Sequence, residues 1–429
     1  TSVIGFPRIG TLRELKFASE KYFRKEISEE QLKETAKELR KTHWNMQKNA
    51  GIDFISSNDF SFYDIVLDTA VLLNIIPKRY KELDLSKIDT YFAMARGYQG
   101  ENGDVKALAM KKWFNTNYHY MVPEMDDDTR IKLNASKPFD QFVEARKIDI
   151  DTKPVIIGPF TVLKLARFTG NKNVTDFADD VIKAYCGILE KFNSIDAQWV
   201  QFDEPYLVYD LSEEDIKLFE ELYKNILSAK RTVKILLQTY FGDIRDCYKQ
   251  VIALNFDGIG LDFIEGKKSL QLVKENGFPA DKVLFAGLIN GKNIWKNHYK
   301  NTLNTIRELK SFADEIVLSS SCSLLHVPYT LKHETKLSDE YKMHFAFAEE
   351  KLVEFKELKA ICNSASLLKI TEYTENCKLF DSKRNCTNPV VQNRVLGIKD
   401  EDFTRFPKFS SREEIQKNEF NLPLFPTTT

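Results

Sequence analysis

Residues 199–205, Trp-Val-Gln-Phe-Asp-Glu-Pro, contain the pattern on which the fold prediction rests. An apolar run over 199–202 is typical of a buried strand, and polar residues with Pro205 end it. The same pattern recurs along the chain, separated by helical periodicity, so the predicted strands are 3–6, 53–55, 154–158, 199–202, 233–237, 258–262, 283–288 and 315–318. Strands that alternate with helices favour parallel pairing, and eight such units predict an α/β fold, a (βα)8 TIM barrel.

The second predicted strand is followed by a long excursion. Residues of about 65–150 hold a helix near 64–74, a glycine-rich loop and aromatic stretches, and we expect a partly folded insertion. Before it, residues 12–50 predict one or two helices, with Ser28 and Gln31 at the spacing of a capping box. The domain prediction is a barrel over 1–362 and, over 363–429, a helical or irregular extension that leads to a further element.

Composition excludes several classes of function. The chain has 429 residues, 43% hydrophobic content and a net charge of -1, which fits a soluble protein without nucleic-acid or membrane partners. The six cysteines are scattered, and there is no apolar leader, which favours reduced thiols and a cytoplasmic location. The motifs GxGxxG, GxxxxGK, CxxC and HExxH are absent.

Residues 3–16, VIGFPRIGTLRELK, place two cations where a helix begins. Arg13 and Lys16 fall at the first turn of the predicted helix, where the helix dipole favours anions instead. Two readings remain open: the side chains point into water, or they converge with helix amides on an anionic ligand. Lys111 and Lys112 beside Trp113 allow the same two readings, a solvated face or cations with an aromatic platform.

Three carboxylates follow predicted strands, at the barrel end where active sites form. Asp203 and Glu204 follow the strand at 199–202, and Asp262 ends the strand at 258–262. Adjacent residues of an extended chain point in opposite directions, so a hydrolase would pair only one of the first two with Asp262. The alternative, which we favour, is that these acids bond loop amides or pair with Arg8.

Cys322 and His326 lie near the end of the last predicted strand. Zinc needs three or four ligands, and the other histidines fall in helical or insertion segments, so metal binding is weakly supported. Cys322 as a nucleophile needs a nearby base, for which His326 is the candidate without a supporting motif.

The chain resembles the N-terminal half of cobalamin-independent methionine synthase, the 5-methyltetrahydropteroyltriglutamate–homocysteine methyltransferase family. The stretches that carry the resemblance are GFPRIG (5–10), RELK (13–16), HWNMQKNAGIDFI (43–55), DFSFYD (59–64), YFAMARG (91–97), KWFNTNYHYMVPE (112–124), QFDEP (201–205), AGLINGKNIW (286–295), SSCSLLH (320–326) and LPLFPTTT (422–429). They extend along almost the whole chain.

The resemblance implies two (βα)8 barrels joined by a linker, with the Zn2+ and homocysteine sites in a second, C-terminal catalytic barrel of the same polypeptide. It implies no cofactor and no catalytic residue in this chain, since Leu237–Phe241 offers no His-x-Cys pair. The tail of 5-methyltetrahydropteroyltri-L-glutamate would bind at Arg13, Glu14, Leu15, Lys16 and Lys112. Methyl transfer then belongs to the full-length enzyme, with this chain inactive alone; the alternatives are a barrel hydrolase and a purely structural barrel.

Overall fold

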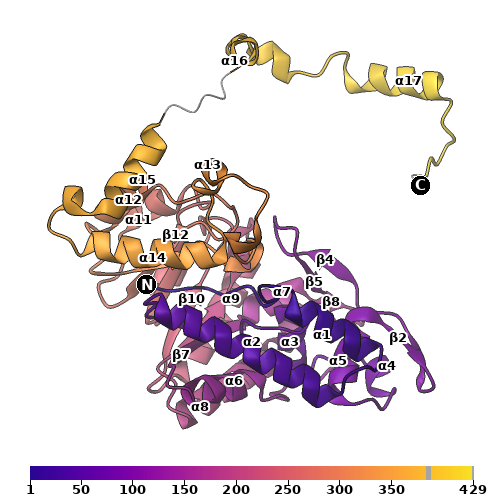
Figure 1. The fold of residues 1–429 in the computed structure, drawn as a ribbon. Helices are drawn as coiled ribbons and strands as arrows, with labels where there is room; N and C mark the ends of the chain where they lie inside the picture. Colours follow the sequence, from indigo (N-terminus) through magenta and orange to yellow (C-terminus); the bar gives the residue numbers. More distant parts are fainter. Residues whose placement is uncertain (383–387, 428–429) are drawn as a thin grey trace. The chain divides into compact units, whose positions relative to one another are not determined.

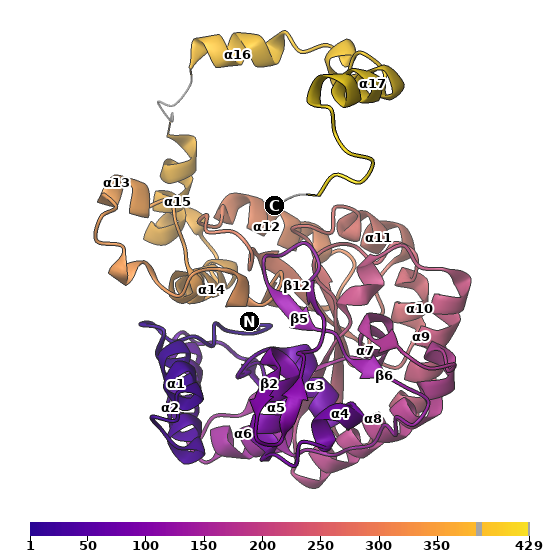
Figure 2. The same cartoon turned by 90° about the vertical axis from the view of Figure 1, so that its right-hand side faces the viewer.

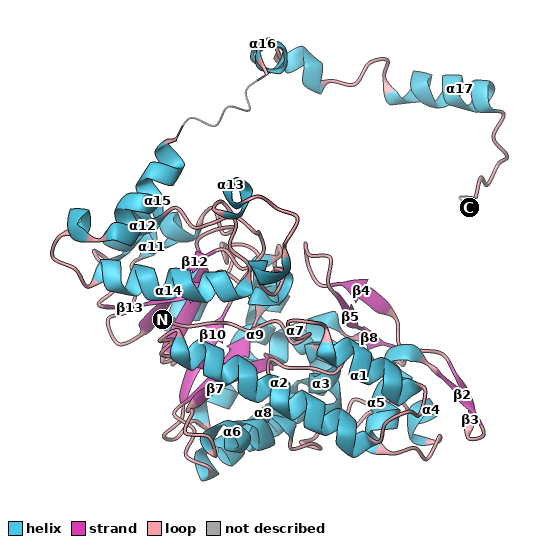
Figure 3. Cartoon of the chain, viewed as in Figure 1, coloured by secondary structure: helices cyan, strands magenta, loops and turns pink. Residues whose placement is uncertain are grey.

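A curled parallel sheet forms the centre of the fold. The computed structural model describes residues 1–382 and 388–427, which excludes Cys386 and the end of the predicted LPLFPTTT linker. Seven strands pair in parallel, in the order β1 (Ile55–Ser57), β7 (Thr152–Ile157), β9 (Trp199–Asp203), β10 (Lys234–Gln238), β11 (Gly258–Asp262), β12 (Val283–Ile289) and β13 (Glu315–Ser320) (Figures 1 and 3). The α/β class, the parallel pairing and the last six strand predictions are confirmed.

The first predicted strand, at 3–6, requires a correction. Pairing in this segment is limited to isolated bridges from Ser2 to Phe54 at one edge of the sheet and to Ser319 at the other. Val3 N–H still donates to the Phe54 carbonyl at 3.4 Å, but the next amides bond side chains: Ile4 N–H donates to Ser320 Oγ at 3.2 Å and Phe6 N–H to Asp59 Oδ2 at 2.8 Å. The segment therefore lies between the two edges without forming a strand.

Helices follow the strands and cover the outer side of the sheet (Figure 2). They are α6 (Lys137–Arg146), α7 (Pro159–Leu165), α8 (Ala178–Ser194), α9 (Glu213–Ser228), α10 (Tyr248–Ala253), α11 (Ser269–Asn276), α12 (Tyr299–Leu309) and α14 (Ala348–Cys362). Their apolar faces bury Phe192, Phe219 and Tyr223 against strand residues such as Phe202. This layer is the main hydrophobic core. The short helix α13 (Asp339–Lys342) buries no residue.

The inner side of the sheet is divided into two layers. Phe54, Trp199 and Phe285 pack edge-to-face at 5.1–5.7 Å between ring centroids and fill the end where the strands begin. Toward the carboxyl ends the interior becomes polar, with Lys153 and Gln201 fully buried. A buried polar layer must be hydrogen-bonded internally, so it determines which side chains can face the mouth of the sheet.

The N-terminal helices and the predicted excursion form the rest of the first compact unit, Thr1–Cys377. Ser28 and Gln31 form the predicted capping box of α2. The elements are α1 (Glu14–Phe23), α2 (Glu29–Asn49), α3 (Ile65–Leu72), α4 (Lys78–Lys81), α5 (Lys87–Arg96), β2 (Tyr98–Gly100), β3 (Gly103–Val105), β4 (Met110–Lys112), β5 (His119–Met121), β6 (Glu124–Met125) and β8 (Arg167–Phe168).

The second compact unit comprises Lys378–Thr429. It contains α16 (Pro389–Leu396) and α17 (Phe409–Phe420), and α15 (Thr371–Asp381) runs up to and across the division. Its large apolar side chains are exposed: Phe403 is 80% exposed, Phe406 89% and Phe409 68%. This unit has no buried core among its described helices α16 and α17.

Candidate functional site

An antiparallel hairpin, β4 with β5, lies over the carboxyl ends of the sheet. Phe114 at its tip stacks on Tyr209 with ring centroids 5.2 Å apart and also contacts Phe241 at 5.6 Å. Tyr118 meets the ring of His326 at 6.1 Å. These partners come from the loops after β9, β10 and β13, so the tip spans the face where parallel barrels place their active sites.

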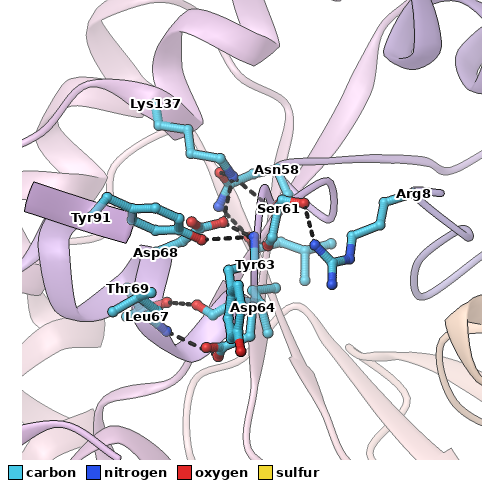
Figure 4. A network of polar contacts seen from close by, with 12 residues as sticks. Arg8, Asn58, Ser61, Tyr63, Asp64, Leu67, Asp68, Thr69, Tyr91 and Lys137 are labelled. Carbon is cyan, nitrogen blue, oxygen red and sulfur yellow. Dashed lines mark hydrogen bonds and ion pairs between the residues drawn. The ribbon is translucent and has the colours of Figure 1, made fainter. Parts of the chain in front are cut away.

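Asp64 links the hairpin to the start of α3. Its carboxylate caps α3 by accepting from the N–H groups of Val66 at 2.8 Å and Leu67 at 3.0 Å, and its other oxygen accepts from Met121 N–H of β5 at 3.1 Å (Figure 4). Burial raises the pKa of Asp64 to about 7. Sequence reasoning missed this residue, although an acid directly before an apolar helix is a helix-capping signal.

The space beneath the hairpin is small. A cavity of about 40 Å³ remains there, bordered by Arg8, Asp59, Trp113, Asp203 and Tyr240. Such a volume accommodates one or a few water molecules, whereas small-molecule sites occupy about 300–1,000 Å³. A wider cavity of about 420 Å³ lies beside it, bordered by the hairpin tip, Lys292 and His326. Trp113, which is only 4% exposed, offers no platform to an external ligand.

Asp203 and Glu204 serve different parts of the structure, as expected for adjacent residues on a strand. Asp203 faces the interior and accepts from Gln201 Nε2 at 2.5 Å and Tyr240 OH at 3.0 Å. Glu204 faces the helices and accepts from Phe160 N–H at 3.0 Å, Thr161 N–H at 2.7 Å and Tyr223 OH at 2.7 Å. Burial raises the pKa of both carboxyls, that of Glu204 to about 7.

Asp262 is committed to backbone amides as well. It accepts from Phe241 N–H at 3.0 Å, Ile264 N–H at 2.8 Å and Glu265 N–H at 3.0 Å, and burial raises its pKa to about 6. Arg8 does not pair with these acids; its guanidinium donates to the carbonyl of Ser61 at 2.7 Å. The reading that Glu204 and Asp262 bond amides is confirmed, and the paired carboxylates that a barrel hydrolase needs do not face a shared cleft.

Cys322 and His326 do not form a nucleophile–base pair. The Cys322 thiol contacts the carbonyl of Ser323 at 3.7 Å, and burial raises its pKa. The ring of His326 packs edge-on against Tyr118 and Phe241, and burial lowers its pKa to about 4. Among the described residues, no hydrogen bond joins the Cys322 thiol to the His326 ring.

The residues present do not fit a zinc site. Within residues 1–382 and 388–427 no group of three or more His, Cys, Asp or Glu side chains could hold a metal ion. At the end of β10, Gln238 and Tyr240 stand in the interior, and neither supplies the nitrogen or thiolate donors that zinc prefers. We therefore derive no chemical step through zinc in this chain.

The stretch Arg13–Lys16 starts α1. Arg13 is the N-cap in the left-handed region, with φ 64°, so it precedes the first turn, and Lys16 lies within that turn. Leu15 is 2% exposed and anchors the helix, while Glu14 Oε2 accepts from Leu12 N–H at 3.0 Å. Arg13 is exposed, and among the described residues its guanidinium has no ion pair. Lys16 has only a 3.8 Å pair with the half-exposed Glu20, which contributes little.

Lys112 ends β4 and lies opposite His119 of β5. It is exposed, and in the described part of the chain its ammonium has no ion pair. The start of α1 reaches the same end of the sheet, because Arg8 bonds Ser61 after β1 and Thr11 Oγ1 lies 3.0 Å from His333 Nε2 after β13. The structure therefore brings Arg13, Lys16 and Lys112 to the carboxyl-end face, on two separate elements.

A polar network that the sequence did not predict joins the end of β1 to α3 and α6 (Figure 4). Lys137 Nζ lies 3.0 Å from Asp68 and donates to Asn58 Oδ1 at 2.7 Å. Ser61 Oγ donates to Asp68 at 2.6 Å, and the Ser61 carbonyl holds Arg8. The segment that leads to Arg13 is thus bonded to the loop after β1.

These features define an α/β protein with a curled parallel sheet, whose carboxyl-end face carries a covering hairpin and exposed cations. Residues 1–314 match the family model described as cobalamin-independent synthase, N-terminal domain. The chain belongs to the cobalamin-independent methionine synthase family, as its N-terminal domain.

Curated relatives agree with this membership. The chain is 54% identical over 428 residues to the 5-methyltetrahydropteroyltriglutamate–homocysteine methyltransferase of Campylobacter jejuni subsp. doylei, and 51% identical to that of Streptococcus suis. All of this chain is covered but only 56% of those relatives, so it spans little more than half their length. A B12-independent methionine synthase from Shewanella sp. shares the fold, with a TM-score of 0.52 at 15% identity, over 78% of this chain and 90% of that one.

Proposed function

We propose that this chain is the part of a homocysteine methyltransferase that holds the polyglutamate tail of its folate substrate. Three exposed cations at the carboxyl-end face, without strong partners of their own, support the proposal. A triglutamate tail is a run of carboxylates, and Arg and Lys bind carboxylates through charge-assisted hydrogen bonds. Arg13, Lys16 and Lys112 would contact the tail, while buried Leu15 and the carboxylate of Glu14 fix the helix start that presents them.

We propose further that the methyl transfer itself belongs to a C-terminal catalytic barrel of the same polypeptide, which would hold zinc and homocysteine. The substrate pair follows from the relatives' name, which joins 5-methyltetrahydropteroyltriglutamate to homocysteine. The amide-bonded Glu204 and Asp262 support a chain without catalytic groups of its own, so the chain alone should not form methionine. The exposed Phe403, Phe406 and Phe409 support a partner surface that covers them.

The proposed domain division is a barrel over residues 1–362, with its insertion at about 65–150, and an extension over 363–429. The bridges from Ser2 to Phe54 and to Ser319 support a closed (βα)8 arrangement in which the first strand is reduced to a single residue. In that arrangement the tail-binding cations lie on the rim of the barrel.

Calorimetric titration of the 429-residue chain tests the proposal. We expect 5-methyltetrahydrofolate with three glutamates to bind about tenfold more tightly than the monoglutamate, and this difference to shrink at high salt. An R13Q/K16Q variant should lose the preference for the longer tail. Equal affinity for both forms, or a preference that survives in the variant, would favour a purely structural barrel.

A further inference from the structure

A second cavity lies away from the hairpin, among helices α2, α3, α5 and the start of α6. Its volume is about 680 Å³, within the range of small-molecule sites. Its walls are largely apolar, with contributions from Phe62, Leu72, Ile76, Leu85 and Ile88. A cavity of this size and lining can bury an aromatic or aliphatic body of about ten to fifteen non-hydrogen atoms.

The inner end of this cavity is polar, and its charged side chains already have ion-pair and hydrogen-bond partners. Asp68 and Lys137 form an ion pair at 3.0 Å, and both are held by further bonds, Asp68 by Ser61 Oγ at 2.6 Å and Lys137 by Asn58 Oδ1 at 2.7 Å (Figure 4). Since each charge of this pair already has its partner, the pair neither requires nor attracts a second net charge. The charged end of a ligand would therefore lie elsewhere in the cavity.

The outer rim carries unbalanced positive charge. Lys33 is neutralised by Glu29 at 2.5 Å, whereas among the described residues Asp140 accepts only from Ser136 Oγ at 2.5 Å and keeps its negative charge. Four lysines against three acids leave the lining with a net charge of +1. Lys81 and Lys87 also line the cavity, and both are exposed; over residues 1–382 and 388–427 neither has an ion pair. Two unpaired ammonium groups beside an apolar cavity complement a single anionic group on an apolar body.

We propose that this cavity binds a small amphipathic carboxylate, with the apolar body against Leu72 and Ile88 and the carboxylate between Lys81 and Lys87. The site is distinct from the proposed tail site. Glu29 and Lys33 begin α2 beyond the C-terminal end of α1, whereas Arg13 lies at the N-terminal end of that ten-residue helix, about 15 Å away along its axis.

Calorimetric titration of the 429-residue chain with 2-naphthoate, and with the uncharged 2-naphthylmethanol, tests this inference. We expect one site for 2-naphthoate with a dissociation constant of about 10–100 μM, and about tenfold weaker binding of the alcohol. K81Q/K87Q should weaken 2-naphthoate about tenfold and leave the alcohol within about twofold. The matched control is K37Q/K41Q, which removes two exposed lysines of α2 outside the cavity and should change neither affinity.

Substitutions that fill the cavity distinguish binding at this site from non-specific binding to apolar surface elsewhere. Ala135 and Thr90 both line the cavity, and A135W should abolish binding of both probes. T90W serves the same purpose from α5 if A135W lowers the melting temperature by more than about 5 °C. Binding that persists in a folded cavity-filled variant, equal affinity for the two probes, or no effect of K81Q/K87Q would overturn the proposal.

Discussion

Asp203 and Glu204 are neighbours in sequence, yet they stabilise opposite sides of one strand. Asp203 accepts from Tyr240 OH at 3.0 Å inside the sheet, whereas Glu204 accepts from Thr161 N–H at 2.7 Å in the helical layer. The strand end that would supply an acid–base pair in a barrel enzyme is used here to connect the interior to α7. The resulting carboxylates maintain the architecture and are unavailable to a substrate.

This arrangement predicts that Glu204 contributes to stability. E204Q keeps the shape of the side chain but replaces one acceptor oxygen with a donor that faces a backbone N–H group. We expect the free energy of unfolding to fall by about 1–3 kcal/mol in urea titrations. The matched control is E213Q, whose side chain is 88% exposed on α9, and it should change stability by less than about 0.5 kcal/mol. An equal loss in both variants would contradict the capping role.

The link from Asp64 to Met121 predicts local dynamics of the hairpin. D64N exchanges an acceptor for a donor near three backbone N–H groups, so α3 and β5 should open more readily. We expect amide hydrogen exchange over residues 119–121 to accelerate by about 10- to 100-fold, since a lost bond of this kind costs about 1–3 kcal/mol. D104N, at an exposed position of β3, should leave exchange there unchanged. Acceleration in both variants would show that Asp64 does not fasten the hairpin.

Because His43 is buried, we expect the free energy of unfolding to fall in acid. Burial among Phe6, Phe60 and Tyr329 lowers its pKa to about 3, and among the described residues its Nε2 has no hydrogen-bond partner. An unfolded histidine, with a pKa of about 6.5, binds a proton that the folded one does not, so this contribution is complete above pH 6.5 and is lost as the pH falls toward 3.

The difference in the free energy of unfolding between wild type and H43L, measured against pH, gives the contribution of His43 alone. The wild-type free energy of unfolding should drop by about 2 kcal/mol more than that of H43L between about pH 6.5 and pH 4.5, where each bound proton contributes about 1.4 kcal/mol per pH unit. Urea midpoints with unchanged m-values measure it. Parallel pH profiles would mean that His43 titrates alike in both states.

The proposed tail site makes a directional prediction on β4. Lys112 and Lys111 are adjacent strand residues and therefore point to opposite faces, which makes one the control for the other. K112Q should weaken binding of the triglutamate substrate by about 3- to 10-fold, and K111Q by less than about twofold. Calorimetry at constant ionic strength measures both. Equal effects would indicate a general attraction by positive charge without a defined contact.

The regular part of the fold was predictable because hydrophobic periodicity alone specifies it. The 258–262 prediction coincides with β11, and the Ser28–Gln31 capping box was read correctly. The first strand was not predictable in this way: Val3 and Ile4 are apolar and fully buried, but the amides of Ile4 and Phe6 bond to Ser320 Oγ and Asp59 Oδ2, which no local pattern reveals.

The candidate site was predictable to a similar degree. Exposed charges such as Arg13 and Lys112 stood out because they oppose a helix dipole or flank an aromatic residue. The partners of Asp64 and Lys137 could not be found, since Met121 and Asp68 lie about 60–70 residues away and are brought together only by tertiary packing. The burial of Trp113 against Tyr120 likewise arises only from tertiary packing, so the sequence left the two readings at Lys111 and Lys112 open.

The bridging of the sheet edges by Ser2 has a consequence during synthesis on the ribosome. Ile4 N–H donates to Ser320 Oγ across a sequence separation of 316 residues, so the segment around Ile4 cannot form this bond until β13 has been synthesised. At about 5–20 residues per second, that delay is roughly 15–60 s. Until then the growing parallel sheet has an open edge at β1, and an unpaired edge can associate with other chains. This open edge therefore persists until β13 has been synthesised.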